Sequence, residues 1–248
     1  MKWVKVIAGA AVVAMSLVLL VYGAHRPEIT IQKVSVSGTH LSDASAIEEI
    51  SKDALDGYYF FFIPKANAFV APLGSIASAV KTAFPEVAAV EVRRTGFEAL
   101  EIDVSERVAL AEWCENGTSS CYLMDETGFI YSDTRAPHPM IRFSGGIQGE
   151  VLGSVYLMED FPSLFSFIGE VERATKLSPV SVKVDENDDV HVDFSEGGTL
   201  MFVRKEDTNE TLQNIASVFA ARRLKNGERF DYADFRFGDK VFVRFIGD

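Results

Sequence analysis

Residues 83–113 read AFPEVAAVEVRRTGFEALEIDVSERVALAEW, and this stretch decides the fold of the first half of the chain. Pro85 ends an apolar helix, because proline lacks the N–H that a helix interior needs. Runs in which apolar and polar residues alternate centre on Val92 and Ile102, and they meet at a turn at Gly96. Two alternating runs joined by such a turn predict an antiparallel pair of strands.

The segment before this hairpin predicts one more strand and two helices. Alternation over 30–37 indicates a short strand, and a helix opens at Ser42-Asp43 and continues through Leu55. A second helix begins near Pro72, since proline is common in a first helical turn. The order β-α-α-β-β predicts two helices that cover one face of a three-stranded sheet.

Between these helices lies the aromatic run Tyr58–Ile63, YYFFFI. We interpret it as core, facing inward. The alternative is that residues 58–62 face outward near a membrane, where aromatic rings settle at the level of the lipid headgroups.

Residues 6–24, VIAGAAVVAMSLVLLVYGA, form an uncharged apolar run. At about 1.5 Å per residue, a helix of this length comes close to crossing the ~30 Å hydrocarbon core of a bilayer. Lys2 and Lys5 precede it, which favours a cytoplasmic N-terminus. We therefore expect a cytoplasmic tail at 1–5, a transmembrane helix at 6–24 and a body outside the cytoplasm. A signal peptide cleaved after Gly23 is the alternative, although the apolar run exceeds the usual ~7–15 residues.

Strand signals dominate the second half, where two amphipathic helices interrupt them. The predicted strands are 110–114, 121–124, 129–132, 180–184, 190–194, 199–203, 230–237 and 240–246, and the predicted helices are 161–174 and 208–224, the second ended by Asn226-Gly227. The fold class is therefore α+β, with a mainly antiparallel second half.

Cys114 and Cys121 enclose a polar segment between two predicted strands, which brings them near each other at the open end of a hairpin. A disulfide fits an external, oxidising location. Two unpaired thiols that happen to flank a loop are the alternative.

Composition excludes several classes of function. The chain has a net charge of −12, and the residues after Arg26 hold 21 basic and 36 acidic side chains. A body this acidic repels nucleic-acid phosphates. The four histidines stand apart in sequence, and no nucleophile elbow, P-loop or dinucleotide motif is present, so we expect no enzyme, cofactor, metal or small-molecule substrate.

The acidic cluster Asp185, Glu186, Asp188 and Asp189 has two interpretations. We favour a solvated turn. A calcium site is the alternative, although the loop lacks the spaced glutamate of an EF-hand.

The last predicted strand, 240–246, has no later strand to cover it. Unless an earlier strand pairs with it, its free N–H and C=O groups invite a strand from another chain. Phe242 and Phe245 would lie on opposite faces of this strand. The alternative is that Val241, Val243 and Phe245 only fill the core.

Five segments give the chain a resemblance to the FtsQ/DivIB cell-division proteins of bacteria. They are IQKVSVSGTHLS (31–42), AFPEVAAVEVRR (83–94), LEIDVSERVALAEW (100–113), LMDETGFIYS (123–132) and FDYADFRFGDKVFVR (230–244). The resemblance implies an uncleaved N-terminal anchor, a POTRA domain at 29–107 and an FtsQ/DivIB-type β-domain at 108–248.

For function, the resemblance implies a non-catalytic scaffold of the divisome at the septum of the inner membrane. Its POTRA domain would help recruitment by upstream division proteins, and its second domain would hold FtsB-like and FtsL-like coiled-coil membrane proteins, the former by strand addition. A family contact motif matches 234–237, which assigns partner contacts to Arg236 and Phe237. We extend the predicted partner-binding surface to Val241, Phe242, Val243, Arg244 and Phe245.

Two other functions compete with this one. A POTRA-bearing secretion or assembly component would also bind extended polypeptides, but the sequence lacks the long train of ~10-residue alternating strands of a membrane barrel. An exported enzyme comes third, and no local motif supports it.

Overall fold

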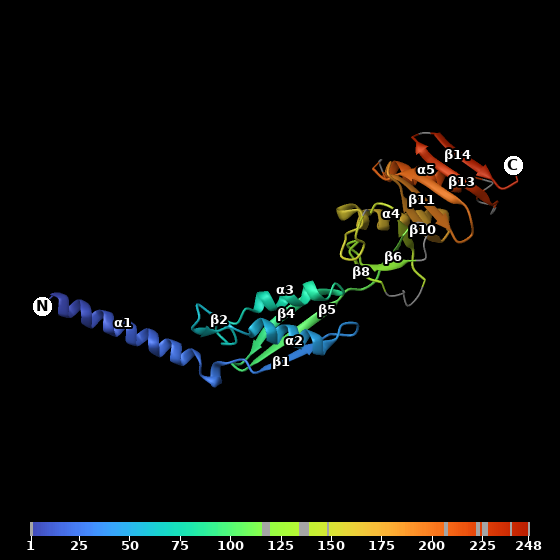
Figure 1. Ribbon diagram of the computed structural model, residues 1–248. Helices are drawn as coiled ribbons and strands as arrows, with labels where there is room; N and C mark the ends of the chain where they lie inside the picture. The colour runs from blue at the N-terminus through green and yellow to red at the C-terminus, as the bar shows by residue number, and fades with distance from the viewer. Residues whose placement is uncertain are drawn as a thin grey trace. The chain divides into compact units, whose positions relative to one another are not determined.

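An N-terminal helix, α1 (Lys2–Ala24), opens the chain (Figure 1). The structure is a computed structural model that describes residues 2–115, 120–133, 139–147, 149–205, 208–221, 224, 228–238 and 240–247. Within that part of the chain, α1 is the one helix long and apolar enough to cross a membrane, over Ile7–Ala24, and none of this window is buried. An apolar helix with every side exposed requires an apolar surrounding, so α1 indicates single-pass membrane anchoring.

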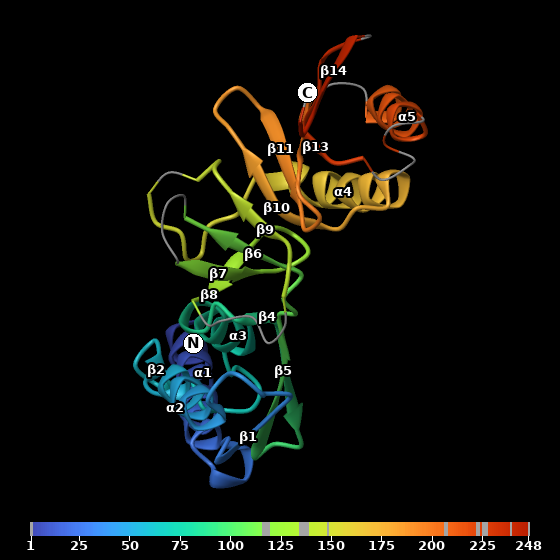
Figure 2. The ribbon, with the colours of Figure 1, turned by 90° about the vertical axis from the view of Figure 1, so that its right-hand side faces the viewer.

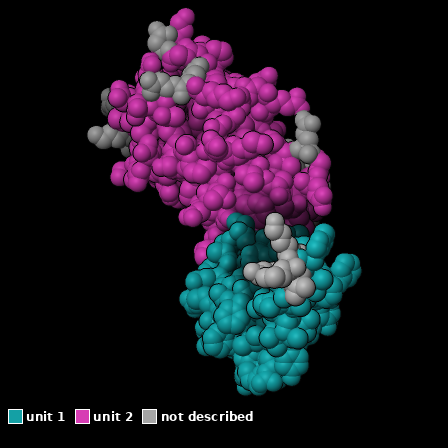
Figure 3. Space-filling model, turned by 90° about the vertical axis from the view of Figure 1, so that its left-hand side faces the viewer, with its two compact units in different colours: residues 1–107 teal, residues 108–248 magenta. Residues whose placement is uncertain are grey.

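The chain divides into two compact units, residues 1–107 and 108–248 (Figure 3). Each unit has a separate cluster of buried apolar side chains. Because each has its own core, the two are described in turn.

Unit 1 contains, within residues 2–107, a three-stranded sheet in the order β1-β5-β4. Its elements after α1 are a 3-10 turn at Pro27–Ile29, β1 (Lys33–Ser37), α2 (Ala44–Leu55), β2 (Tyr58–Tyr59), β3 (Ile63–Pro64), α3 (Leu73–Ala83), β4 (Val87–Thr95) and β5 (Ala99–Glu106). β1 runs parallel to β5, and β4 runs antiparallel to it. The predicted order is confirmed, with a short β2–β3 hairpin inserted between the two helices.

The core of unit 1 lies between the sheet and its two helices. Leu100, Ile102 and Val104 alternate along β5 and are buried, together with Ile47 of α2 and Ile76 of α3. The Asp43 carboxylate accepts a hydrogen bond from the Ser45 N–H at 2.8 Å, which caps the start of α2 as its sequence predicts.

The favoured prediction that the aromatic run 58–62 faces the core is wrong. This run forms the tip of the β2–β3 hairpin, and Phe60, Phe61 and Phe62 are exposed, Phe61 to 92%. The physical reason is that β2 and β3 are only two residues long and form a separate hairpin. The residues between them therefore project away from the three-stranded sheet and do not pack across it.

Unit 2 contains, within its described residues, a nine-stranded mixed sheet in the order β14-β13-β12-β11-β10-β9-β6-β7-β8. The strands are β6 (Ala111–Cys114), β7 (Cys121–Met124), β8 (Ile130–Ser132), β9 (Arg142–Ser144), β10 (Pro179–Val184), β11 (Asp189–Phe194), β12 (Thr199–Val203), β13 (Phe230–Phe237) and β14 (Lys240–Phe245). Most neighbours pair antiparallel, while β9 pairs parallel with β6 and β10, and β12 pairs parallel with β13. The predicted α+β class with a mainly antiparallel second half is confirmed.

Helices α4 (Phe161–Thr175) and α5 (Thr208–Phe219) pack against each other and against the sheet (Figure 2). A 3-10 turn at Met158–Asp160 precedes α4. α5 ends at Phe219, before the predicted end at Leu224, and the Ala221 N–H bonds the Val218 carbonyl in a turn after it. Leu224 is itself helical. The expected cap at Asn226-Gly227 lies outside the described residues.

Candidate functional site

The strand β14 forms one edge of the unit 2 sheet, and its inner side pairs antiparallel with β13. No described residue pairs with its outer side. β13 is bulged at two places, between Phe230 and Tyr232 and between Asp234 and Phe237, whereas β14 advances one residue per step between Phe242 and Phe245. The strand that faces outward is therefore the regular one of the pair.

The direction of the free backbone groups follows from one hydrogen bond. Ile246 N–H donates to the Arg229 carbonyl at 3.1 Å, toward the β13 side. In an antiparallel ladder, successive residues point their N–H and C=O alternately toward the neighbour and away from it. Val241 and Val243 therefore direct their backbone groups to the open side, while Phe242 and Arg244 bond to β13.

The side chains of β14 separate into two faces. Those of Val241, Val243 and Phe245 are half-buried and pack against the unit 2 core. Phe242 lies on the other face, 52% exposed, and meets the 54% exposed Phe237 edge-on with ring centroids 5.4 Å apart. The edge thus combines free backbone groups with an exposed pair of aromatic rings.

A charged network stiffens the bulged part of β13 beside this pair. Arg236 donates to both Asp234 carboxylate oxygens, at 2.9 and 2.7 Å, and to Asp189 of β11 at 2.5 Å. The hydrogen bond from Arg236 lowers the pKa of Asp234, although burial opposes it. Arg236, a predicted contact residue, is therefore held by two carboxylates of its own chain. Its side chain lies 5.8 Å from the Phe237 ring centroid.

Arg244, the other charged residue predicted on this surface, lies on the exposed face of β14. It forms an ion pair with Asp231 of β13 and stacks over Tyr232, 4.9 Å from the ring centroid. The structure thus brings all seven predicted contact residues onto one hairpin, and whether they contact a partner stays a prediction.

The opposite edge of the same sheet, β8, is covered. Ile130 N–H donates to the Ser154 carbonyl at 2.9 Å, and Gly153 N–H donates to the Ile130 carbonyl at 2.8 Å. An isolated bridge joins Phe129 and Val155. The segment 153–156 therefore occupies the outer side of β8, a contact that no sequence pattern had indicated.

In the acidic cluster at 185–189, the carboxylates of Asp185 and Asp188 make contacts within the protein. Asp185 accepts the N–H groups of Asn187 and Asp189, and Asp188 pairs with Arg204 and Lys205. The hydrogen bonds from Lys205 and Arg204 lower the pKa of Asp188. These contacts fit the turn interpretation and leave fewer carboxylate oxygens for a calcium ion.

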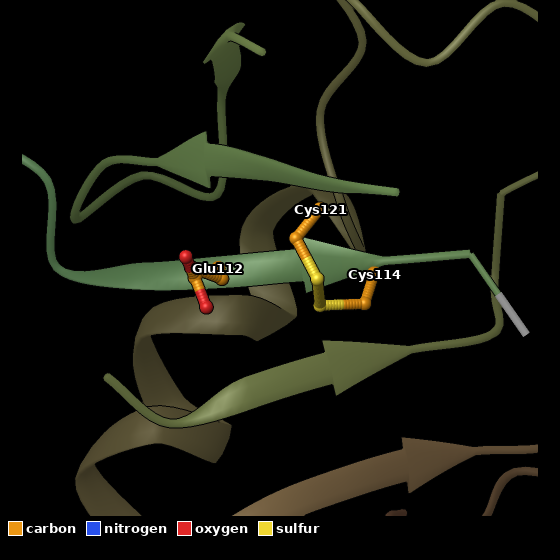
Figure 4. A group of neighbouring side chains, drawn as sticks. All are labelled: Glu112, Cys114 and Cys121. Atoms are coloured by element: carbon orange, nitrogen blue, oxygen red, sulfur yellow. A yellow bond between two sulfur atoms is a disulfide. The ribbon is translucent and has the colours of Figure 1, made fainter. Parts of the chain in front are cut away.

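One group of possible metal ligands lies close together among the described residues, namely Glu112, Cys114 and Cys121 (Figure 4). The two cysteine sulfurs are bonded to each other as a disulfide across the β6–β7 ladder. Because a disulfide sulfur is not a thiolate, this group does not have the donors of a zinc site.

Comparison with known families matches residues 29–107 to the POTRA domain, FtsQ-type. No curated protein matches the chain. Unit 1 after α1 is therefore an FtsQ-type POTRA domain, with a β-α-α-β-β order. Behind a single apolar helix, this domain fits an FtsQ/DivIB-type protein, whose family is generally non-catalytic and whose role is protein interaction in cell division.

Proposed function

We propose that the chain is a non-catalytic divisome scaffold at the septum, and that it holds FtsB-like and FtsL-like membrane proteins by adding a partner strand to β14. The observation that carries this proposal is the edge of β14, with outward backbone groups at Val241 and Val243 and no strand paired on its outer side among the described residues. An edge of this kind recruits an extended segment through main-chain hydrogen bonds, which supply affinity for any extended chain.

Side chains next to that edge supply the selectivity of this interaction. Phe242 and Phe237 form an exposed aromatic pair on one face, so a partner segment with apolar side chains on that face would cover about half of each ring's surface. Arg236 acts by holding Phe237 and the bulge in place, since both of its carboxylate partners belong to its own chain. The aromatic pair is then the anchor, and the arginine supports it.

Photo-crosslinking in living cells tests the docking site. A crosslinking amino acid at Phe242 should capture an FtsB-like chain, identified by mass spectrometry. The matched control is the same amino acid at Val155, which is also apolar and exposed but lies at the covered β8 edge. Equal capture from both positions, or capture from Val155 alone, contradicts the proposal.

A second function, binding of extended polypeptides by the POTRA domain, is favoured by one observation. Within residues 2–107, β1 and β4 each pair on one side only, with β5. A crosslinker at the exposed Glu91 of β4 separates the two functions, because it captures varied chains if the POTRA edge binds substrates. Charged side chains make strand addition at the β4 edge less favourable, since Arg93 of β4 forms ion pairs with Glu91 and Asp103.

The proposal also fixes the orientation of the chain, with the N-terminus in the cytoplasm and both units outside. Lys2 and Lys5, at the N-terminal end of α1 and before its apolar window, support it. Protease added to spheroplasts should then degrade residues beyond about the end of α1 and spare an N-terminal tag; protection of the body would contradict it.

A further inference from the structure

We propose that the tip of the β2–β3 hairpin inserts into the membrane surface at the side where α1 leaves the bilayer. We call residues Tyr58–Phe62 the aromatic tip. The partner is the lipid headgroup and upper acyl region of the membrane that α1 crosses. This is a second membrane contact, independent of strand addition at β14.

Exposure of the rings is the first observation. Phe60 is 83% exposed, Phe61 is 92% exposed, and Tyr58 and Phe62 are also exposed. Scattered exposed apolar residues need no explanation, but four aromatic rings within five residues form a patch that water disfavours. Such a patch calls for an apolar or interfacial partner.

The chain holds this patch close to the membrane by a short connection. Ala68 N–H donates to the Ile29 carbonyl, and Ile31 N–H donates to the Ala66 carbonyl, both at 2.8 Å. Ile29 is five residues after the end of α1 at Ala24, which spans at most roughly 18 Å even when fully extended. The base of the hairpin is therefore tied near the point where the chain emerges from the bilayer.

Direct contacts with the end of α1 reduce that separation further. Asn67 donates its side-chain N–H to the Ala24 carbonyl at 3.0 Å, and the rings of His25 and Tyr58 stack with centroids 6.0 Å apart. In Figure 1 the hairpin lies on the side of unit 1 from which α1 extends. The hairpin thus faces the membrane.

Other exposed apolar side chains gather at the same end. Phe69 and Phe97 contact each other with ring centroids 5.3 Å apart, and Gln32 N–H, at the start of the sheet, donates to the Glu98 carbonyl. Of the eight large exposed hydrophobic residues in 25–107, all but Leu41 lie here: Tyr58, Phe60, Phe61, Phe62, Phe69, Val70 and Phe97. Seven of the eight thus lie beside the point where the chain enters the domain.

Charge follows the same pattern. The 29 residues from Gly57 to Pro85 contain no aspartate or glutamate, in a chain that holds 36 of them, whereas Lys65 lies in the hairpin base. Membrane surfaces that carry anionic lipid repel carboxylates and attract lysine. The acid-free segment is therefore compatible with close approach to lipid.

The backbone of the aromatic tip has a conformation that is unfavourable for phenylalanine. Phe60 and Phe61 have φ values of 50° and 68°, and Phe62 N–H donates to the Tyr59 carbonyl at 3.1 Å. A hairpin turn with two left-handed residues normally uses Asn-Gly, since other side chains are strained there. Phenylalanine at these two positions makes the turn less stable than Asn-Gly would, and both rings project outward.

Site-directed spin labelling of the full chain in vesicles of phosphatidylethanolamine and phosphatidylglycerol tests the proposal. The described residues contain no free cysteine, so Phe61→Cys provides a specific label site. The matched control is Leu41→Cys, also exposed but outside the patch. The ratio of oxygen to nickel-complex accessibility should be several-fold higher at 61 than at 41.

Three results decide the outcome. Equal aqueous ratios at 61 and 41 overturn the proposal, and so does protection of position 61 from both reagents with spin–spin broadening, which indicates a second copy of this chain. A label at Phe62→Cys should show the high ratio, and adding Phe60→Ser with Phe61→Ser should return it to the aqueous value. Because these side chains are exposed, the double variant should unfold at the same temperature as its parent; an unchanged ratio in it contradicts the proposal.

Discussion

The two edges of the unit 2 sheet are built in opposite ways. β8, with three residues, is closed on its outer side by the segment 153–156 through the Ile130–Ser154 and Gly153–Ile130 hydrogen bonds. β14, with six residues, has no strand paired with its outer side among the described residues. Within the part of the chain that the structure describes, the same sheet thus has one edge covered by its own chain and one edge with no paired strand.

This difference teaches where a partner strand can enter. Unprotected edges invite aggregation, so proteins usually cover, shorten or charge them. Here the covered edge shows that the fold can close a strand with a single irregular segment. An open β14 beside an exposed aromatic pair therefore favours a docking function over an incidental feature of the fold.

The largest expected effect comes from proline at the open edge. Val243→Pro removes an N–H that points away from β13, so the β13–β14 pairing should survive while a partner loses a main-chain hydrogen bond and meets the proline ring. We expect affinity for an FtsB-like partner to fall about 100-fold, close to 3 kcal/mol, in a binding titration.

The control for this variant is Val243→Ala, which keeps the N–H and changes only a half-buried side chain. It should bind within a few-fold of the parent. If Val243→Pro binds as tightly as Val243→Ala, the docking strand lies elsewhere and the contrast between the two edges has no functional meaning.

A substitution at Gly128 should displace the segment that covers the β8 edge. This residue has a φ of +83°, and an added Cβ would lie 2.7 Å from the Tyr156 carbonyl oxygen. Gly128→Ala should therefore displace the covering segment and lower the free energy of unfolding of unit 2 by about 3 kcal/mol, from backbone strain and overpacking together. Denaturant unfolding followed by fluorescence of the buried Trp113, in a Trp3→Phe background, measures this.

Gly197 provides the matched control, because its φ is +93° but nothing lies within 4 Å of an added Cβ. Gly197→Ala should lower the free energy of unfolding by only about 1 kcal/mol, from strain alone. Equal losses in the two variants would mean that the Tyr156 contact does not hold the covering segment.

Rigidity of the open edge depends on the Asp234–Arg236 pair. Asp234→Asn should lower the free energy of unfolding of unit 2 by roughly 2 kcal/mol at pH 7, since a charge-assisted hydrogen bond is lost. The pKa of Asp234 is lowered in the folded protein, so its stabilisation is present above the usual unfolded value near ~3.9 and disappears as pH falls through the folded pKa.

The gap between Asp234→Asn and the parent should consequently narrow once the pH falls below about 4. Urea unfolding at neutral and acidic pH, followed by Trp113 fluorescence, measures it. A gap that stays constant as the pH falls would show that the carboxylate charge contributes nothing to the bulge.

The smallest effect is expected from the aromatic side chain. Phe242→Ala removes one ring of an exposed pair while it keeps the backbone, so affinity should fall about tenfold, near 1.4 kcal/mol. Stability should not change, because the ring is half exposed. Leu152→Ala, near the covered edge and 41% exposed, should leave both affinity and stability unchanged.

Much of the fold is predictable from the sequence because its signals are periodic. The β4–β5 hairpin, the helices α2 and α3, and the antiparallel β10–β11–β12 arrangement all follow from alternation, helical spacing and glycine turns. β9 was not predicted, because three residues before Gly145 are too few to establish a period.

The site is predictable in part. The sequence indicates a terminal strand that lacks a later partner, but not that 153–156 closes the other edge, since that contact has no period or motif. Arg236 pairs with Asp189, 47 residues earlier, and no local pattern reports such a contact. The aromatic tip shows the limit most clearly, because composition alone cannot distinguish a buried aromatic run from an exposed one.

The Cys114–Cys121 disulfide has a consequence for how the sheet resists slippage. The two residues face each other directly in the β6–β7 register. A shift of one residue would turn every side chain of β7 to the opposite face, and the bond forbids it. Because the loop that the disulfide closes is short, the disulfide lowers the entropy of the unfolded chain less than one that closes a long loop. Its main effect is therefore to fix the register of β6 and β7, and reducing agents would remove this constraint.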